Sequence, residues 1–240
     1  MHKLQKSLNI LVAFSLTPHV LAADYDIDLP VDLEQSIFAD LVKDLGAVIS
    51  YRAITPAEHL GELGVDLGIE LTGTSMETDA LSQVTTGNAP STVYAPKIHV
   101  HKGLPMNIDL GAVYSVLPES NIRYFGAEIR YAFLEGGVGM PALALRGTYS
   151  VLTGVEHFDL SSAGIELTLS KGFTLLTPYA GVGSVWLGGD SDHDTLSSES
   201  FTEFKYFVGL NTNFGLVNLA AEWDKTGDNN SYSAKLGFRF

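Results

Sequence analysis

The sequence of 240 residues has no cysteine, half as many basic as acidic side chains, and no long apolar run. The lack of cysteine excludes disulfide scaffolds, cysteine nucleophiles and thiolate metal sites. With 14 basic against 28 acidic residues, the formal net charge of −14 argues against nucleic-acid binding, because phosphates require a basic surface. No internal segment reaches the ~18 uninterrupted apolar residues of a membrane-spanning helix. The length suits one large domain or two small ones.

Residues 1–22 have the pattern of a secretory signal peptide. Lys3 and Lys6 precede a short apolar run, and Val20 and Ala22 supply the branched and small residues expected before a cleavage site. The stretch is too short for a membrane anchor. A buried amphipathic helix is the alternative, but the segment has no helical stripe. We therefore expect the chain to be exported and cleaved near Ala22.

Beyond about residue 60, apolar and polar residues alternate, which is the pattern of β-strands. In the last segment, Tyr232, Leu236 and Phe238 share one face and Lys235 lies on the other. The segments that follow this pattern are 62–72, 92–102, 105–116, 121–134, 141–152, 158–170, 174–188, 201–213, 216–225 and 231–240.

The length of these segments favours a membrane protein. Strands of soluble proteins are typically about 5–6 residues long, whereas a tilted membrane-spanning strand needs about 9–11. Most connections are short, and the polar face is rich in charge and glycine, as in a wet lumen. We therefore expect an all-β fold, a closed antiparallel up-and-down transmembrane β-barrel of about 10–12 strands, whose closure removes the open edges that lipid does not tolerate. A soluble sandwich or a lipocalin-like barrel is the alternative.

These features together resemble a known group. With its signal peptide, long alternating strands, acidic composition and aromatic last residue, the chain is similar to Gram-negative outer-membrane β-barrel proteins, including uncharacterised barrels of that kind, over roughly residues 60–240. The resemblance implies the cell outer membrane as location, and the lipid bilayer, its lipopolysaccharide and the barrel-assembly machinery as partners. It implies no activity, because porins, proteases, lipases and adhesins share the architecture. The residues that match the assembly signal of the group are Tyr232, Leu236, Phe238 and Phe240.

The resemblance also predicts which connections lie outside the cell. If the C-terminal end lies in the periplasm, short inner turns alternate with longer outer loops, and the two longest connections, 73–91 and 189–200, both lie outside. Residues 47–54 also alternate and would form an eleventh strand, and the short segment 24–29 a twelfth. Bacterial barrels have even strand numbers, so either 47–54 does not cross or a further strand precedes it.

Residues 32–45 are expected to form an amphipathic helix. Asp32 can cap its start and Gly46 can end it. Its polar face is mainly acidic, unlike that of helices bound to membrane surfaces. We therefore expect residues 23–46 to form a plug or a periplasmic cap and residues 47–240 to form the barrel. The apolar stripe of the helix consists of Leu33, Ile37, Leu41 and Leu45.

The alternation places a nearly balanced set of charged side chains inside the barrel. Such an interior is either filled by ion pairs and hydrogen bonds or forms a narrow, charge-lined pore. The inward residues are Asp66, Glu70, Lys97, His99, His101, Asp109, Glu128, Arg130, Arg146, Glu166, Glu203, Lys205, Glu222, Asp224, Lys235 and Arg239.

Two patterns within this set and its loops bear on chemistry. One register places His99 opposite Asp109 and His101 opposite Asn107, where a His–Asp pair could move protons or bind a metal, although a buried structural pair is more common. In residues 190–194 every second residue is an aspartate, as in a calcium-binding loop, but the later glycine and glutamate of an EF-hand are missing. A solvated acidic loop is the alternative.

The predicted function is a narrow channel or a binding and transport barrel for a small solute. A sealed structural or surface-interaction barrel is the alternative. A rim hydrolase that uses Asp192 and His193 is a third hypothesis, but the sequence has no Gly-x-Ser-x-Gly elbow. We therefore expect no catalytic residues, no metal ligands, no cofactor and no enzymatic activity.

Overall fold

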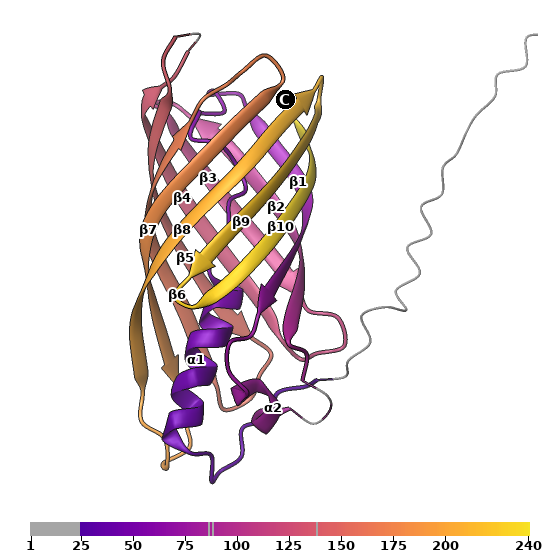
Figure 1. Cartoon of the computed structure of the whole chain (residues 1–240), viewed down its shortest axis with the longest axis vertical. Helices are drawn as coiled ribbons and strands as arrows, with labels where there is room; N and C mark the ends of the chain where they lie inside the picture. The colour runs from indigo at the N-terminus through magenta and orange to yellow at the C-terminus, as the bar shows by residue number, and fades with distance from the viewer. Residues whose placement is uncertain (1–24, 86, 88, 138) are drawn as a thin grey trace, which may run out of the picture.

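The computed structural model describes residues 25–85, 87, 89–137 and 139–240, so the predicted signal peptide lies outside the described residues. Ten antiparallel strands form a closed barrel in which neighbours in sequence pair and β1 pairs with β10 (Figure 1). The closed up-and-down barrel is thereby confirmed, with ten strands. The strands are β1 (Val65–Ser75), β2 (Thr92–Leu104), β3 (Ile108–Val116), β4 (Arg123–Glu135), β5 (Ala142–Thr153), β6 (Asp159–Ser170), β7 (Leu176–Asp190), β8 (Glu199–Phe214), β9 (Val217–Thr226) and β10 (Asn229–Arg239). The helices are α1 (Gln35–Ile49) and α2 (Ala80–Val84).

The even strand number is reached without either of the extra strands considered from the sequence. Residues 47–49 are the end of α1, and residues 50–54 continue without strand pairing. Between residues 25 and 29 there is only an isolated bridge from Ile27 to Thr85. The first strand therefore begins at Val65, and residues 47–64 contribute to the interior of the barrel rather than to its wall.

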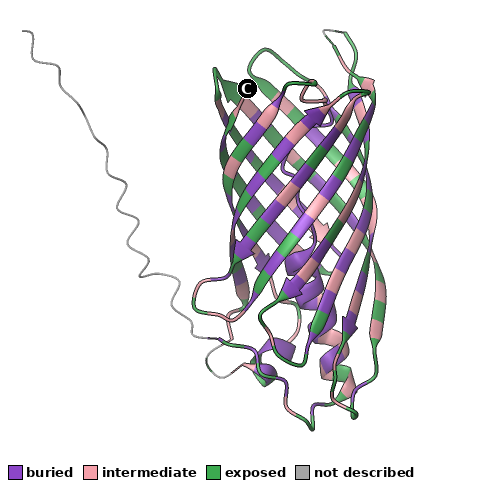
Figure 2. Ribbon diagram, turned by 180° about the vertical axis from the view of Figure 1, so that it is seen from behind, coloured by how far each residue is buried: buried purple, intermediate pink, exposed green. Residues whose placement is uncertain are grey.

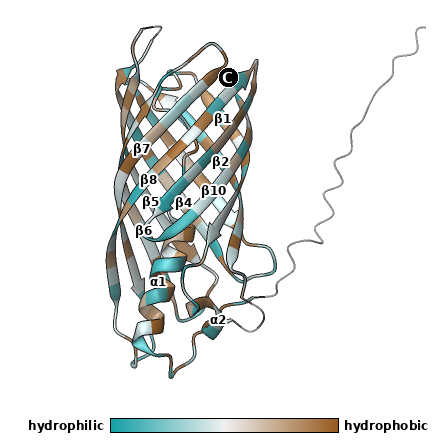
Figure 3. Ribbon diagram, viewed as in Figure 1, coloured by the Kyte–Doolittle hydropathy of each residue, from teal (hydrophilic) through white to brown (hydrophobic). Residues whose placement is uncertain are grey.

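The outer surface of the barrel is apolar. Along β10, for example, the outward Leu236 and Phe238 are exposed while the inward Ser233 and Lys235 are buried. Buried and more exposed residues alternate along the strands in Figure 2. Every strand carries exposed large apolar side chains. Hydrophobic and hydrophilic residues alternate along the strands of the wall in Figure 3. A water-soluble protein rarely exposes so much contiguous apolar surface, and a closed barrel satisfies its own backbone in lipid. The fold is a transmembrane β-barrel.

Neither described helix has the length and apolar character needed to cross a membrane. The longer one, α1, begins at Gln35 and continues through Gly46 to Ile49, so the expected start at Asp32 and stop at Gly46 are wrong. Gly46 has a packing role instead. A Cβ at this position would lie 2.7 Å from Cδ1 of Leu187 on the inner face of β7, so the glycine lets the helix approach the wall.

The helix α1 fills one mouth of the barrel. It lies at the end opposite the C-terminus, beside α2, and contacts β5 to β8 (Figure 1). Leu41 and Leu45 are fully buried, and the rings of Phe38 and Phe158 pack edge to face with centroids 5.7 Å apart. The two longest connections, 76–91 and 191–198, lie at this same end.

The chain then continues along the lumen to the other end. After α1, residues 50–64 contact the inner wall of the barrel and lead into β1, where Val65 N donates to the carbonyl of Phe240 over 2.7 Å. Residues 25–64 thus enter at one mouth and leave beside the C-terminal end of the barrel. We call residues 25–64 the plug and the end that holds α1 the mouth.

Candidate functional site

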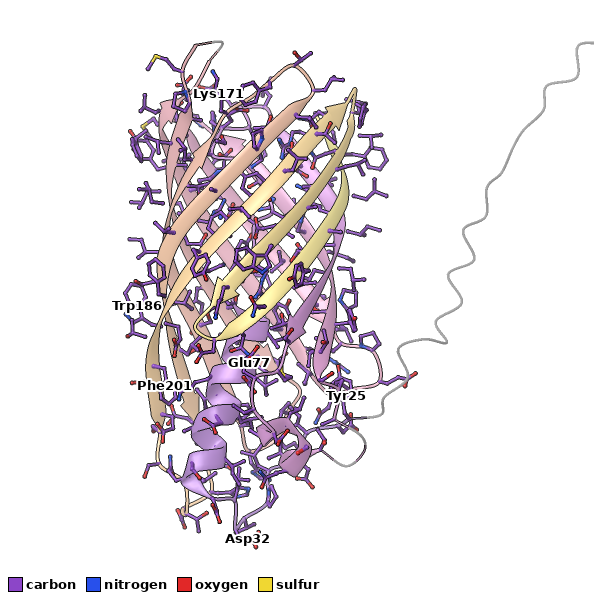
Figure 4. The ribbon with its side chains drawn as sticks, in the orientation of Figure 1. Tyr25, Asp32, Glu77, Lys171, Trp186 and Phe201 are labelled. Atoms are coloured by element: carbon purple, nitrogen blue, oxygen red, sulfur yellow. The ribbon has the colours of Figure 1, made fainter. Side chains whose placement is uncertain are left out.

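The first part of the plug crosses the mouth and is held by the connecting loops (Figure 4). Asn121 Oδ1 accepts from the amide of Ile27 at 2.9 Å, and Asn121 Nδ2 donates to the carbonyl of Ile27 at 2.8 Å. Thr195 Oγ1 donates to the carbonyl of Val31 at 2.7 Å. Burial raises the pKa of Tyr25 to about 12. The segment 25–34 is therefore bound to two separate loops of the barrel.

A buried carboxylate on α1 joins the helix to the wall. Asp44 is 1% exposed, and its Oδ1 accepts from Asn229 Nδ2 of β10 at 2.8 Å. Its Oδ2 accepts from the amide and the hydroxyl of Thr78 at 3.1 and 2.8 Å. Because a buried charge needs such donors, Asp44 fixes both the helix and the start of the β1–β2 connection.

Arg52 forms a two-point ion pair between the plug and the wall. Its Nε and Nη2 donate to the two carboxylate oxygens of Asp224 on β9, at 2.5 and 3.2 Å, and Nη2 also donates to Ser231 Oγ at 2.6 Å. The same guanidinium donates to the carbonyls of Ala47 and Val48 at 3.0 and 3.2 Å. These carbonyls are in the last turn of α1 and have no further helical partner. Arg52 therefore ends the helix and pairs it with the barrel, and both members of the ion pair are buried.

A chain of ion pairs runs around the wall beside this contact. Lys205 Nζ lies 2.8 Å from Glu166 Oε1, and Arg146 Nη1 lies 2.8 Å from Glu166 Oε2. Arg146 Nε also lies 2.9 Å from Glu128 Oε2, and His101 Nε2 lies 3.2 Å from Glu128 Oε1. All five side chains are buried, so Glu128 and Glu166 are both neutralised by residues of the wall.

Tyr51 of the plug is bound to both ends of this series of ion pairs, at Lys205 and at His101. Its backbone carbonyl accepts from Lys205 Nζ at 2.7 Å, and its hydroxyl lies 3.2 Å from His101 Nε2. Tyr51 is 2% exposed. Hydrogen bonds therefore join the plug directly to the charged side chains of the wall at Tyr51.

Asp66 on β1 is the centre of a second group of charges. Its Oδ2 accepts from Lys235 Nζ at 3.0 Å and from Arg239 Nη2 at 2.6 Å, both on β10. His99 Nε2 lies 3.4 Å from Oδ1, and His101 is adjacent. Asp66, His99 and His101 have the spacing of a metal site, but two cationic side chains already neutralise the carboxylate. The group suits an ion-pair network better than a cation.

Glu70 lies on the same face of β1, four residues after Asp66, and has its own partners. It pairs with Lys97 of β2 and accepts from Thr72 Oγ1 at 2.7 Å. Thr72 Oγ1 is also 2.7 Å from Ser233 Oγ on β10. The seam between β1 and its two neighbours is therefore cross-linked by buried polar side chains.

Near the C-terminal end, Asp109 and Arg130 hold the last part of the plug. Arg130 Nη2 and Nε donate to Asp109 Oδ2 at 2.8 and 3.1 Å, and Nη1 donates to Thr55 Oγ1 and to the carbonyl of Pro56, both at 2.7 Å. His59 Nδ1 lies 3.0 Å from Asp109 Oδ1. The plug is thus bound to the wall along the whole length of the lumen.

The structure places all the inward residues expected from the sequence on the inner face. Most are buried, whereas Glu203 and Arg239 are half-buried near the two ends. The expected register of His99 and His101 is wrong, because they pair with Val113 and Gly111. The plug residues Tyr51, Arg52 and His59, which contact members of this set, were not predicted as partners. Asp44, which bonds to Asn229 of the wall, was not predicted as a partner either.

Comparisons with known proteins assign no family to this chain. No family model matches the chain, and no curated protein matches it. The N-terminal β-barrel domain of Pseudomonas aeruginosa OprF has a TM-score of 0.39 at 14% identity, over 75% of this chain and 99% of that one. The KdgM porin in complex with disordered oligogalacturonate gives 0.37 at 8% identity, over 74% and 99%. Neisserial surface protein A gives 0.31 at 12% identity, over 73% and 94%. At these scores, nothing about ligand or activity is transferred.

Proposed function

We propose that the chain is an outer-membrane β-barrel whose lumen is closed by its own N-terminal segment and whose mouth makes contacts at the cell surface. The apolar exterior of all ten strands supports residence in a bilayer. Barrels of this kind occur in outer membranes and have their longer loops outside. The two longest connections and α1 share one end, so the plugged mouth faces the medium and the C-terminal end faces the periplasm.

The observation that carries this proposal is the binding of the plug to the wall through buried charges. Removing one partner of a buried ion pair costs about 3–5 kcal/mol. To leave the lumen, the plug has to separate Arg52 from Asp224 and also Arg130 from the Thr55 and Pro56 acceptors. Because these costs fall in one event, spontaneous opening is rare, and the protein at rest conducts no solute.

Introduced cysteines test the position of the plug, because the chain has none of its own. An ideal Cβ at Gly189 lies 3.3 Å from the Cβ of Val42 on α1, close to the ~3.5–4.5 Å of disulfides. The V42C/G189C variant should therefore form a disulfide in intact cells. Gly188 precedes Gly189 on β7 and faces the other side of the wall. The V42C/G188C variant is therefore the matched control and should stay reduced. Equal cross-linking of both pairs would contradict the plugged mouth.

Planar-bilayer recordings test the closed lumen directly. The unmodified protein and oxidised V42C/G189C should both show no steady conductance, and proteoliposomes should not swell in small sugars. A stable open level in the unmodified protein would refute the closed state.

A narrow passage for a small solute is the second candidate, and the charged wall behind the plug favours it. Seven buried acids and six basic residues face the lumen from the strands, and they would line any path that opened. This candidate requires the plug to move. It predicts that a plug-release variant such as R52M conducts and that oxidation of V42C/G189C in the same background abolishes the current.

A further inference from the structure

Three side chains at the rim of the mouth form a cluster that lies outside the ion-pair network of the lumen. His157 lies in the β5–β6 connection, and Asp192 and His193 lie in the β7–β8 connection. His157 Nδ1 is 2.8 and 2.9 Å from the two oxygens of Asp192, and the rings of His157 and His193 have centroids 4.9 Å apart. One ligand atom from each residue lies within 4.8 Å of the others. The cluster is accessible, with the His157 and Asp192 side chains 48% and 67% exposed.

The plug determines which nitrogen of His193 is available. His193 Nε2 lies 3.1 Å from the backbone carbonyl of Leu29. A carbonyl only accepts, so Nε2 carries the proton and Nδ1 keeps its lone pair. Histidines that bind metals commonly donate their other N–H to a backbone carbonyl, which fixes both ring orientation and tautomer. The contact with Leu29 gives His193 this arrangement.

The loop backbone holds the cluster in place. Ser191 Oγ donates to the carbonyl of His157 at 2.8 Å and accepts from the amide of His193 at 3.3 Å, so one hydroxyl joins the two connections. His157 has a φ of 60°, a left-handed conformation that is uncommon outside glycine and tends to persist where the surroundings require it. The two histidines are therefore presented together by structure rather than by chance exposure.

The surroundings are negative. Besides Asp192, the acidic residues Glu156 and Asp28 lie close enough to His157 to act on it electrostatically. Asp190 and Asp194 flank the pair in the sequence. This differs from the group around Asp66 in the lumen, where Lys235 and Arg239 occupy the carboxylate. At the rim, the local charge favours a bound cation.

We propose that His157, Asp192 and His193 bind one first-row divalent metal ion, with Zn²⁺ as the best match. Two imidazoles and one carboxylate, completed by water, are a donor set that suits tetrahedral Zn²⁺. The ion fixes His193 and so strengthens its hydrogen bond to Leu29, which couples metal binding to the plug segment 25–34. The site does not depend on whether the lumen conducts.

The test uses the refolded full chain without its signal peptide and without a polyhistidine tag, in detergent. Calorimetric titration with Zn²⁺ should show one ion per chain, and Co²⁺ should give the visible absorption of a tetrahedral site. H157Q, H193Q and D192N should each weaken binding at least about tenfold, and D79N, an exposed acid at the same end of the barrel, should not. The heat-dependent gel mobility of each variant checks that the barrel is folded.

Two results would overturn the proposal. One is no stoichiometric binding to the unmodified protein, and the other is equal affinity in H193Q, which would mean adventitious surface binding. Hydrogen exchange tests the coupling to the plug. Zn²⁺ should slow amide exchange in residues 25–34 of the unmodified protein but not in H193Q, and an unchanged rate on saturation would refute the coupling.

Discussion

Replacement of Arg52 by methionine is the sharpest test of the plugged barrel. The substitution keeps much of the side-chain volume but removes the cation that faces Asp224. Asp224 is 0% exposed and would keep Thr226 Oγ1, at 3.2 Å, as a neutral donor. A carboxylate left unpaired in this way costs about 3–5 kcal/mol. The carbonyls of Ala47 and Val48 lose their donor as well, so we expect R52M to fall within or above that range.

The measurement is the free energy of unfolding in urea for barrels folded into lipid vesicles, followed by the fluorescence of Trp186 and Trp223. D224N should also destabilise, and the R52M/D224N double variant should lose less than the sum of the two, with a coupling of about 0.5–3 kcal/mol. The control is K43M, because Lys43 makes a surface pair with Asp40 at 3.9 Å and a cation–π contact with the Phe201 ring at 4.6 Å, each worth about 1 kcal/mol or less.

A free energy for R52M within about 0.5 kcal/mol of the unmodified protein, the range of a surface substitution, would refute the reasoning. Additive effects of R52M and D224N would also refute it, because they would show that the two groups do not interact in the folded barrel.

Three further predictions follow from particular positions. Gly46→Val should destabilise by about 1–3 kcal/mol, because its Cβ meets Leu187 at 2.7 Å, whereas Gly137→Ala, with nothing within 4 Å, should be neutral in the same urea assay. Ile98→Arg, on the lipid face of β2 at 66% exposure, should cost about 2–4 kcal/mol if it lies near the bilayer midplane, and Ile98→Leu should not. In metal-free protein, Asp192 raises the pKa of His157 and His157 lowers that of Asp192. The pair therefore stabilises the rim above the ordinary carboxyl pKa of 3.8, where Asp192 is charged, and below the ordinary imidazole pKa of 6.5, and it weakens as pH rises through the raised pKa of His157. Protection factors in residues 190–194 should fall as the pH rises above the ordinary imidazole pKa of 6.5, and an unchanged profile, or the same fall in H157Q, would contradict this.

The wall of the barrel was predictable because lipid and lumen place opposite demands on alternate residues. On β10, Leu236 faces lipid and Lys235 faces the lumen, and a shift of one residue would exchange them. The same constraint acts on every strand. The alternation therefore gave the ten segments of the wall and the inward set of charges without any knowledge of their partners, although it left the total number of strands open between ten and twelve.

The plug was not predictable in this way because it has no lipid side. Tyr51 and Arg52 are both buried, as are the residues before and after them, so alternation there does not report an orientation. The period-two pattern of residues 47–54 is the end of a helix followed by a chain surrounded on all sides. Gly46 was wrongly predicted to end the helix. The glycine instead allows the helix to pack closely on Leu187, and a contact with a distant strand cannot be read from the local sequence.

The register error between β2 and β3 arose from the position of the turn. The sequence suggested a turn centred on residue 104, but Met106 and Asn107 adopt positive φ values of 65° and 60°, which centre it two residues later. That shift moves the partner of His99 by four positions, from Asp109 to Val113. Asp109 instead pairs with Gly103 and meets Arg130 and the plug.

Burial of charge and closure of the barrel are therefore expected to occur together. The plug leads directly into β1, and Asp66 of β1 finds its cations on β10, so the last strand pairing brings both groups into contact. A barrel that closed first would enclose Asp224 without Arg52. The uncompensated buried charge would destabilise that barrel by about 3–5 kcal/mol. It would also require α1 to enter past Leu187, which lies against Gly46. We therefore expect the strands to close around a plug that is already in place, and the mutual dependence of Arg52 and Asp224 in the double-variant experiment to extend to the rate of folding.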